Sequence, residues 1–177
     1  MGSLIITKRQ RHGIVGSALA LLASVVIAMS AIGGSSLIST DSDLPTDSFD
    51  LFTGGEAVFN DFAGKPLVIN FWASWCPACV GELPDIQAVH DRFGDDVTIL
   101  GMANADQRGA ALSLANEVGL TYTLGDDPTG ELFRSLDLFA MPSTIFVSAD
   151  GQIQEVFGGQ LNESALADRI DTLIETS

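Results

Sequence analysis

The chain has 177 residues, of which 46% are hydrophobic, and a formal net charge of −15 at pH 7; this length allows one domain with additional segments. All 23 acidic residues but only five of the eight basic residues follow residue 40, so residues 41–177 carry a net charge of −18. A domain with this charge repels nucleic acid and anionic lipid, which excludes nucleic-acid binding.

The N-terminal part of the chain contains a long apolar segment. Residues 13–40 carry no charged side chain, and Ile14–Ile32 would form a helix about 28 Å long, close to the hydrocarbon thickness of a bilayer. Basic residues precede this segment and the first acidic residue is Asp41, a bias that keeps the N-terminus in the cytoplasm. We therefore predict a cytoplasmic segment at 1–12 and a transmembrane signal-anchor at 13–32.

This interpretation makes the chain a single-pass protein of the cell membrane, with its C-terminal domain in the periplasm or on the outer surface. A cleaved signal peptide is the alternative, because small residues at Ala28–Ala31 offer a cut site. A lipoprotein is excluded, since no cysteine lies near the N-terminus. Residues 33–48 are small and polar and predict a flexible linker. A compact domain is expected at 49–177.

This domain has the pattern of an α/β fold. Continuous β-branched and aromatic runs predict buried strands, and two runs around a tight turn predict a hairpin. The strands are expected at Pro66–Ala73 and Val97–Ala103, and the hairpin at Ser143–Ser148 and Gln152–Gly158. Helices are expected after the cysteine pair and at about Gln107–Val118, Thr129–Leu136 and Glu163–Glu175, with a solvated acidic turn at Gly125–Gly130. This order predicts a mixed central sheet flanked by helices.

The only two cysteines, Cys76 and Cys79, lie in the stretch NFWASWCPACVGELP. A disulfide between them would close a loop too short to stabilise the fold much. If a helix begins at Cys76, its free N–H groups and positive dipole end stabilise a thiolate, and Cys79, one turn later, can resolve a mixed disulfide. Pro77 fits the first helical position because it lacks an N–H. Trp75 would either form an apolar contact surface beside the sulfurs or pack into the core.

Two other roles for the cysteines fail. A structural zinc site needs four ligands, and besides the cysteines the chain offers only His12 and His90. Haem attachment needs a histidine after the second cysteine, where this chain has Val80. No metal and no cofactor are therefore expected, and His90 is expected to be a partly exposed helix residue.

The sequence FWASWCPAC, followed about 60 residues later by MPSTIFV, resembles that of proteins with the thioredoxin fold. In particular it resembles the TlpA/ResA-like membrane-anchored thiol–disulfide oxidoreductases, over about Phe49–Ile174. The resemblance implies that Cys76 is the attacking sulfur and Cys79 the resolving one. It also implies that Pro142 is a cis-proline facing the disulfide, and that the backbone of Met141 before it is free to pair with a client strand.

Two further positions match that branch. Pro84 corresponds to the proline that kinks the active-site helix. A proline inside any helix has this effect, because it lacks an N–H and its ring clashes with the preceding turn. Asn70 stands where many thioredoxins have a buried aspartate, and this branch has a glutamate three residues beyond the second cysteine, here Glu82. Helix geometry puts that carboxyl group beside Cys79, where burial would raise its pKa and let it accept or return the thiol proton. A solvated helix glutamate, like Asp85, is the alternative.

The resemblance implies a reductant outside the cytoplasm that exchanges electrons with client protein disulfides, for example those of apocytochrome c before haem attachment. A membrane thiol protein would recharge the pair with electrons. The residues alone leave other functions open: an oxidant that installs disulfides, a peroxiredoxin-like peroxidase, or a non-catalytic peptide-binding module near Pro142 with a permanently oxidised pair. A peroxidase would need a hydroxyl residue where this chain has Ala73.

Overall fold

The structure of the protein, a computed structural model, describes residues 44–177 and contains one seven-stranded mixed sheet. The strands lie in the order β2-β1-β5-β4-β3-β6-β7, with β3, β4 and β5 parallel and the others antiparallel. Their bounds are β1 Phe49–Leu51, β2 Glu56–Ala57, β3 Leu67–Trp72, β4 Thr98–Asn104, β5 Thr123–Asp127, β6 Ser143–Val147 and β7 Ile153–Gly158. The helices are the 3-10 helix η1 Phe59–Phe62 and the α-helices α2 Pro77–Phe93, α3 Arg108–Val118, α4 Glu131–Ser135 and α5 Glu163–Thr176.

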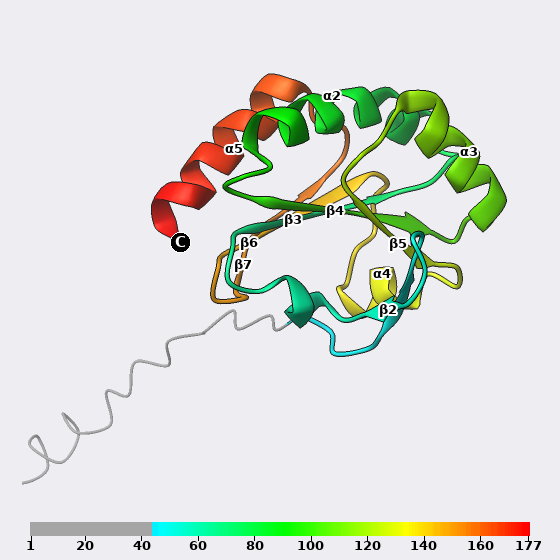
Figure 1. Cartoon of the computed structure of the whole chain (residues 1–177), viewed down its shortest axis with the longest axis horizontal. Coiled ribbons are helices and arrows are strands. Elements are labelled where there is room, and N and C mark those ends of the chain that lie inside the picture. Colours follow the sequence, from blue (N-terminus) through cyan, green and yellow to red (C-terminus); the bar gives the residue numbers. More distant parts are fainter. Residues whose placement is uncertain (1–43) are drawn as a thin grey trace, which may run out of the picture. The chain divides into compact units, whose positions relative to one another are not determined.

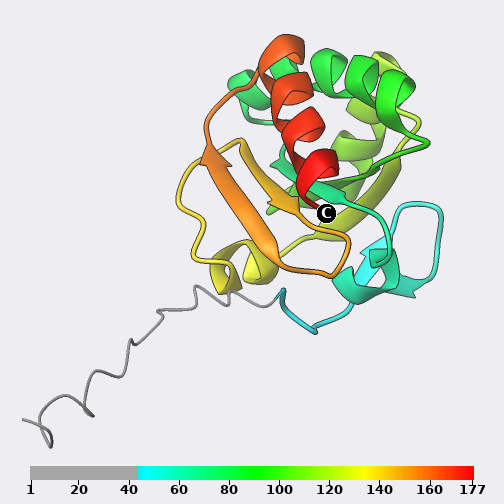
Figure 2. The same ribbon diagram turned by 90° about the vertical axis from the view of Figure 1, so that its left-hand side faces the viewer.

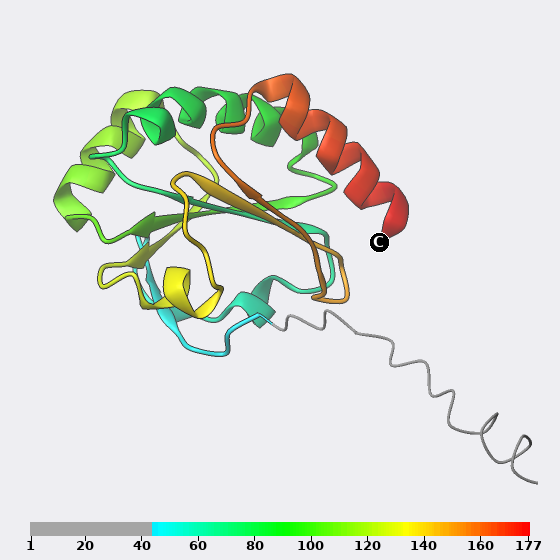
Figure 3. The ribbon, with the colours of Figure 1, turned by 180° about the vertical axis from the view of Figure 1, so that it is seen from behind.

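Strand β3 lies inside the sheet, with a neighbour on each side, and it is apolar except for Asn70. All six of its residues are buried, and it pairs in parallel with β4 and antiparallel with β6. A strand covered on both sides needs such a continuous apolar run. Helices α2, α3 and α5 cover one face of the sheet, and α4 and η1 lie on the other (Figures 1 and 3). The β1–β2 hairpin forms one edge of the sheet.

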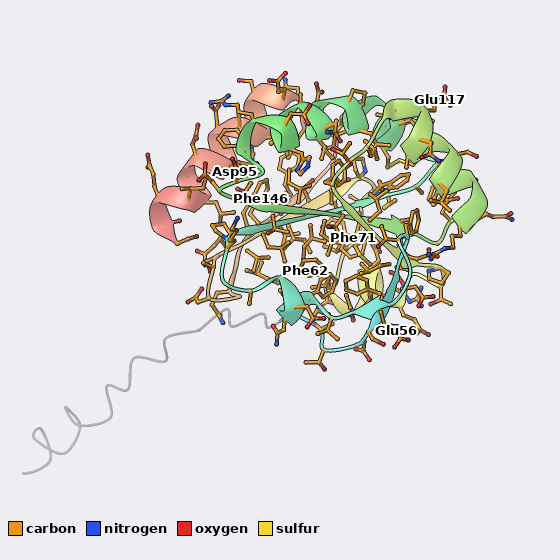
Figure 4. All side chains as sticks on the ribbon, viewed as in Figure 1. Glu56, Phe62, Phe71, Asp95, Glu117 and Phe146 are labelled. Carbon is orange, nitrogen blue, oxygen red and sulfur yellow. A yellow bond between two sulfur atoms is a disulfide. The ribbon has the colours of Figure 1, made fainter. Side chains whose placement is uncertain are left out.

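The two faces hold separate apolar clusters, and Figure 4 shows side chains filling the space on both sides. Phe71 in β3 belongs to the cluster on the α4 side, where its ring meets Phe133 edge-on at 5.6 Å. Phe146 in β6 belongs to the cluster beneath α2 and α5. Labelled acidic residues such as Glu117 lie on the outside of the molecule, as the negative charge of the domain requires.

The thioredoxin-like α/β fold with its mixed sheet is confirmed, as are the two predicted central strands, the hairpin and the four helices. The sequence did not predict β1, β2 or η1, because elements of two to four residues are too short to show a period. Leu44, inside the predicted linker, is buried against the same cluster as Phe59. None of the helices within residues 44–177 is long and apolar enough to cross a membrane. The predicted signal-anchor at 13–32 lies outside these residues.

The prediction of a solvated acidic turn at Gly125–Gly130 is wrong. Gly125, Asp126 and Asp127 form the end of β5, and the two aspartates are only 6% and 3% exposed. Burial is possible because both carboxylates have partners: Asp126 accepts a hydrogen bond from Arg108, and Asp127 accepts one from the N–H of Phe133 at 2.9 Å. The acids therefore fasten neighbouring segments instead of facing water.

Arg108, at the start of α3, joins three segments that are distant in sequence. Its guanidinium lies 3.0 Å from Asp126 in β5, donates to the carbonyl oxygen of Leu51 in β1 at 2.6 Å, and stacks over the ring of Phe52. Arg108 binds one carboxyl oxygen of the buried Asp126, and the other oxygen has no hydrogen-bond partner among the described residues. Arg108 therefore supplies the charge that lets this carboxylate stay buried.

We predict that Arg108→Ala lowers the free energy of unfolding by roughly 2 kcal/mol, because it leaves a buried carboxylate unpaired. Chemical denaturation followed by circular dichroism measures the change. Arg169→Ala is the matched control, since its partner Glu155 is exposed, and it should cost less than about 1 kcal/mol. Equal losses in the two variants would show that Asp126 does not depend on Arg108.

Candidate active site

Helix α2 begins at the cysteine pair. Cys76 is the N-cap residue of the helix, Pro77 occupies its first turn, and Cys79 lies one turn on. The two cysteines form a disulfide, with their Cα atoms 5.3 Å apart. The backbone N–H of Cys79 donates a hydrogen bond to the sulfur of Cys76 at 3.2 Å. A sulfur atom thus takes the place of the capping oxygen that most helices use, next to the positive end of the helix dipole.

The two sulfurs differ in their access to solvent. Cys76 is 6% exposed, whereas Cys79 is fully buried against Trp72 and Leu83 in the apolar cluster between α2, α3 and the sheet. An incoming disulfide therefore meets Cys76 first. This asymmetry supports the predicted division into an attacking and a resolving sulfur.

The loop before Cys76 is fixed by the loop that follows β4. Asp106 accepts hydrogen bonds from the Ser74 N–H at 2.6 Å and from the Ser74 hydroxyl at 2.9 Å. The indole N–H of Trp75 donates to the carbonyl oxygen of Ala105 at 3.1 Å, while the side chain remains 57% exposed. Trp75 is thus held at its polar end and presents its ring beside the disulfide, so simple core packing does not describe it.

The sequence did not identify Asp106. A signal existed, because β3 and β4 are parallel neighbours, so the residues after both strands meet at one edge of the sheet. The left-handed backbone of Ala105, with φ of 48°, turns the chain there. Such a conformation is uncommon for a residue other than glycine.

The second predicted segment, Met141 and Pro142, adjoins the cysteines. The peptide bond between them is cis, and Met141 packs against the cluster that contains Cys76 and Cys79. Pro142 is buried, and its carbonyl oxygen accepts a hydrogen bond from Gly159 at 2.8 Å. Within residues 44–177 the backbone of Met141 takes part in no backbone hydrogen bond.

Glu82 is fully buried on α2, three residues after Cys79. Residues at this spacing lie on the same side of a helix, and both of these side chains face the interior. One carboxyl oxygen accepts a hydrogen bond from the N–H of Leu161 at 3.1 Å, and the other has no partner among the described residues. Burial raises the pKa of Glu82 to about 7, and the hydrogen bond from Leu161 opposes that rise. A solvated glutamate is excluded.

Asn70, at the position of the aspartate found in many thioredoxins, is fully buried in β3. Its amide group donates to the hydroxyl of Thr144 in β6 at 3.1 Å. An amide has no proton to exchange near neutral pH, so Asn70 cannot relay protons. Its bond to Thr144 joins β3 to β6, and its amide group also opposes the rise in the pKa of Glu82. Glu82, by contrast, has a pKa of about 7, which is the range that suits a group able both to accept and to return a proton.

Comparisons with known proteins agree with this geometry. The model of the AhpC/TSA family matches residues 41–156. The chain is 33% identical over 125 residues to the thiol:disulfide interchange protein HelX of Rhodobacter capsulatus, covering 68% of this chain and 69% of that protein. It is 29% identical over 103 residues to the thiol-disulfide oxidoreductase ResA of Oceanobacillus iheyensis, covering 58% of this chain and 54% of that one.

Solved structures show the same fold. DsbF of MTB, whose structure was determined in mixed oxidised and reduced forms, matches with a TM-score of 0.68 and 29% sequence identity. The match covers 72% of this chain and 95% of that one.

The raised pKa of Glu82 predicts a specific dependence of stability on pH. Between pH 4.5 and about 7 the folded carboxyl group keeps its proton while the unfolded one loses it, so stability falls as the pH rises through this window. The stabilising contribution is full below pH 4.5, and the total loss is roughly 3 kcal/mol. We predict that Glu82→Gln removes this loss. Urea denaturation of the oxidised protein at pH 5 and pH 8 measures it.

The control is Glu117→Gln, which changes an exposed glutamate of α3 and should leave the pH dependence of the wild-type protein intact. If Glu82→Gln and the wild-type protein lost equal stability between pH 5 and pH 8, Glu82 would be ionised normally in the folded state.

Proposed function

The chain belongs to the AhpC/TSA family of thioredoxin-like proteins and is a thiol–disulfide oxidoreductase, and on that premise we propose that it reduces client protein disulfides outside the cytoplasm. The observation that carries the proposal is the placement of the two sulfurs. Cys76 caps a helix and keeps an exposed fraction of 6%, while Cys79 is fully buried. A disulfide placed in this way does little for stability and is suited to exchange.

The reaction starts from the dithiol form. The Cys76 thiolate attacks one sulfur of the client disulfide, and a mixed disulfide forms as the other client sulfur leaves as a thiolate. Cys79, once deprotonated, attacks the sulfur of Cys76 and releases the second client thiolate. Two electrons pass to the client, both client sulfurs take up protons, and the enzyme is left with the Cys76–Cys79 disulfide that the structure contains.

Glu82 is the proton acceptor for Cys79 in this scheme. Its burial on the same side of α2 and its pKa of about 7 support the role, because a carboxylate that easily gains a proton can deprotonate a neighbouring thiol as it becomes a nucleophile. In the reverse half-reaction the protonated carboxyl group returns the proton. Asp85, partly exposed one residue beyond Pro84, has no such environment.

The client lies across Trp75, Met141 and Pro142 in this proposal. The unpaired backbone of Met141 supports it, because an extended segment can add to such a backbone as a further strand. The ring of Trp75, the residue directly before Cys76, is 57% exposed and offers an apolar contact surface.

The wider setting of the reaction follows from the sequence. Residues 13–32 would anchor the protein in the cell membrane, with residues 1–12 in the cytoplasm and the segment 33–48 joining the anchor to the exported domain. A membrane thiol protein would supply the electrons that regenerate the dithiol. Apocytochrome c, whose cysteines must be reduced before haem attachment, is the client class that we propose.

A peroxidase is disfavoured by the residue at Ala73. This position is buried and carries no hydroxyl group, so it cannot position a peroxide beside Cys76. The direction of transfer, reductant or oxidant, depends on how far the thiolate form is stabilised. The relatives named as oxidoreductases or interchange proteins are compatible with both directions.

We predict that Cys79→Ser accumulates mixed disulfides between Cys76 and its clients, because the resolving sulfur is gone. Cells expressing the full chain are quenched with acid and alkylated, and the adducts are detected on non-reducing gels. Cys76→Ser is the matched control and should form no client adducts. The proposal fails if Cys79→Ser forms no adducts linked through Cys76 during turnover.

A second prediction concerns the resolving step. Glu82→Gln should slow exchange with a client disulfide by roughly 10- to 100-fold near pH 7, because Cys79 loses its proton acceptor, and should change the pH profile of Cys79 alkylation. Stopped-flow fluorescence and timed alkylation measure the two effects, with Glu117→Gln as control. An unchanged alkylation profile would remove Glu82 from the mechanism.

A further inference from the structure

A shallow apolar hollow lies beside the proposed client site. It has a volume of about 290 Å³ and is formed by the loop after α4 and by the outer strand β7. Its apolar lining consists of Leu136, Leu138, Phe139, Ala140 and Val156, together with Gly158. We call this feature the Phe139 hollow.

Two large apolar side chains at the hollow are exposed to solvent instead of packing in the core. Phe139 is 96% exposed and Val156 is 50% exposed. Within the described part of the chain, the only other large apolar side chain with such exposure is Trp75, at the disulfide. Exposed apolar side chains that gather on one surface usually mark a contact site. The surface of this domain is otherwise rich in acidic residues, so the apolar group stands out.

The hollow is continuous with the segment that adjoins the cysteines. Ala140, which lines it, directly precedes Met141. Gly158 lines the opposite side, and a Cβ at that position would lie 3.1 Å from the Cβ of Ala140. The next residue, Gly159, donates its N–H to the carbonyl oxygen of Pro142. The surface therefore runs from the cis peptide bond into the hollow without an intervening element.

Strand β7 leaves this region open. It is the last strand of the sheet and pairs only with β6 (Figure 2). Gly158 has no side chain to fill the hollow, and Val156 projects from the same face of β7 because alternate residues of a strand share a face. A client segment that pairs with the backbone of Met141 in an extended conformation can thus reach the hollow within about three residues, at roughly 3.3 Å per residue.

We propose that the Phe139 hollow is a specificity subsite that receives one large apolar side chain from the client, a few residues from the cysteine that Cys76 attacks. This inference rests on the proposed function and deepens it. The occupant is an extended segment with a leucine-sized or aromatic side chain. Asp137, the charged residue of the lining, disfavours an acidic residue there, and the net charge of the domain does the same at longer range.

The test uses the full chain in mild detergent, reduced with dithiothreitol and desalted. The substrates are ten-residue peptides closed by a disulfide between cysteines at positions 5 and 10. Each peptide carries one leucine, placed in turn at each of the four positions before and the four positions after the first cysteine. A peptide with serine at all these positions is the reference. For the wild-type enzyme we expect one or two leucine positions to raise kcat/KM by roughly tenfold, and for Phe139→Ser we expect this advantage to disappear.

Two controls separate the subsite from the chemistry. Oxidised glutathione has no large apolar side chain, so its reduction should be equal in the wild-type enzyme and in Phe139→Ser, which alters only an exposed side chain. Glu155→Gln, at the position before Val156 on β7, should keep the leucine preference, whereas Val156→Thr should weaken it.

The outcomes are distinct. A leucine preference that persists in Phe139→Ser, or that is missing from the wild-type enzyme although it reduces the peptides, overturns the subsite and leaves the proposed function standing. A wild-type enzyme that reduces glutathione but none of the peptides overturns the proposed function and the subsite together.

Discussion

A single hydrogen bond marks the constraint on which the site depends: the N–H of Cys79 donates to the sulfur of Cys76 at the first turn of α2. Because the helix starts at that sulfur, the positions of the following residues are fixed by helix geometry. Cys79 and Glu82, at intervals of three residues, both turn inward. The central strand β3 supports this arrangement, since it ends just before the loop that leads into the helix.

Glu82 is a fully buried carboxyl group in the interior behind the sulfurs. A buried carboxyl group with one unpaired oxygen lowers stability at neutral pH, and an apolar residue would pack there more easily. The same burial brings the pKa of Glu82 to about 7, where proton exchange with a thiol is efficient. Asn70 and Thr144 keep the strands beneath it paired without contributing a second titrating group.

Outside the cysteine pair, the exposed surface supports the proposed position of the client. The indole N–H of Trp75 donates a hydrogen bond to Ala105, and the N–H of Ser74 donates one to Asp106. These two bonds hold the loop before Cys76 in place. The backbone of Met141 makes no backbone hydrogen bond within residues 44–177, and its neighbour Ala140 lines the Phe139 hollow. A client would therefore meet a preformed surface around one reactive sulfur.

Much of this could be predicted from the sequence, for identifiable reasons. The run at Pro66–Ala73 is apolar except for Asn70, so it indicated a buried strand. The three-residue spacing of Cys76, Cys79 and Glu82 indicated that all three lie on one side of a helix. Asp126 and Asp127 were misjudged because their burial depends on Arg108 and on the N–H of Phe133, partners that only the folded chain brings near. Asp106 and Phe139 were missed for the same reason. Asp106 binds Ser74, which is 32 residues away in the sequence, and Phe139 lines a hollow that forms only when its loop lies beside β7.

The most direct test of the central claim is a redox titration of Cys76 and Cys79 in the full chain against glutathione and dithiothreitol buffers. A sulfur pair built for exchange should open and close reversibly in one two-electron step, at a midpoint potential roughly between −120 and −270 mV. A midpoint toward the negative end identifies a reductant. A pair that stays closed below about −300 mV would behave as a structural disulfide, and that result would contradict the account.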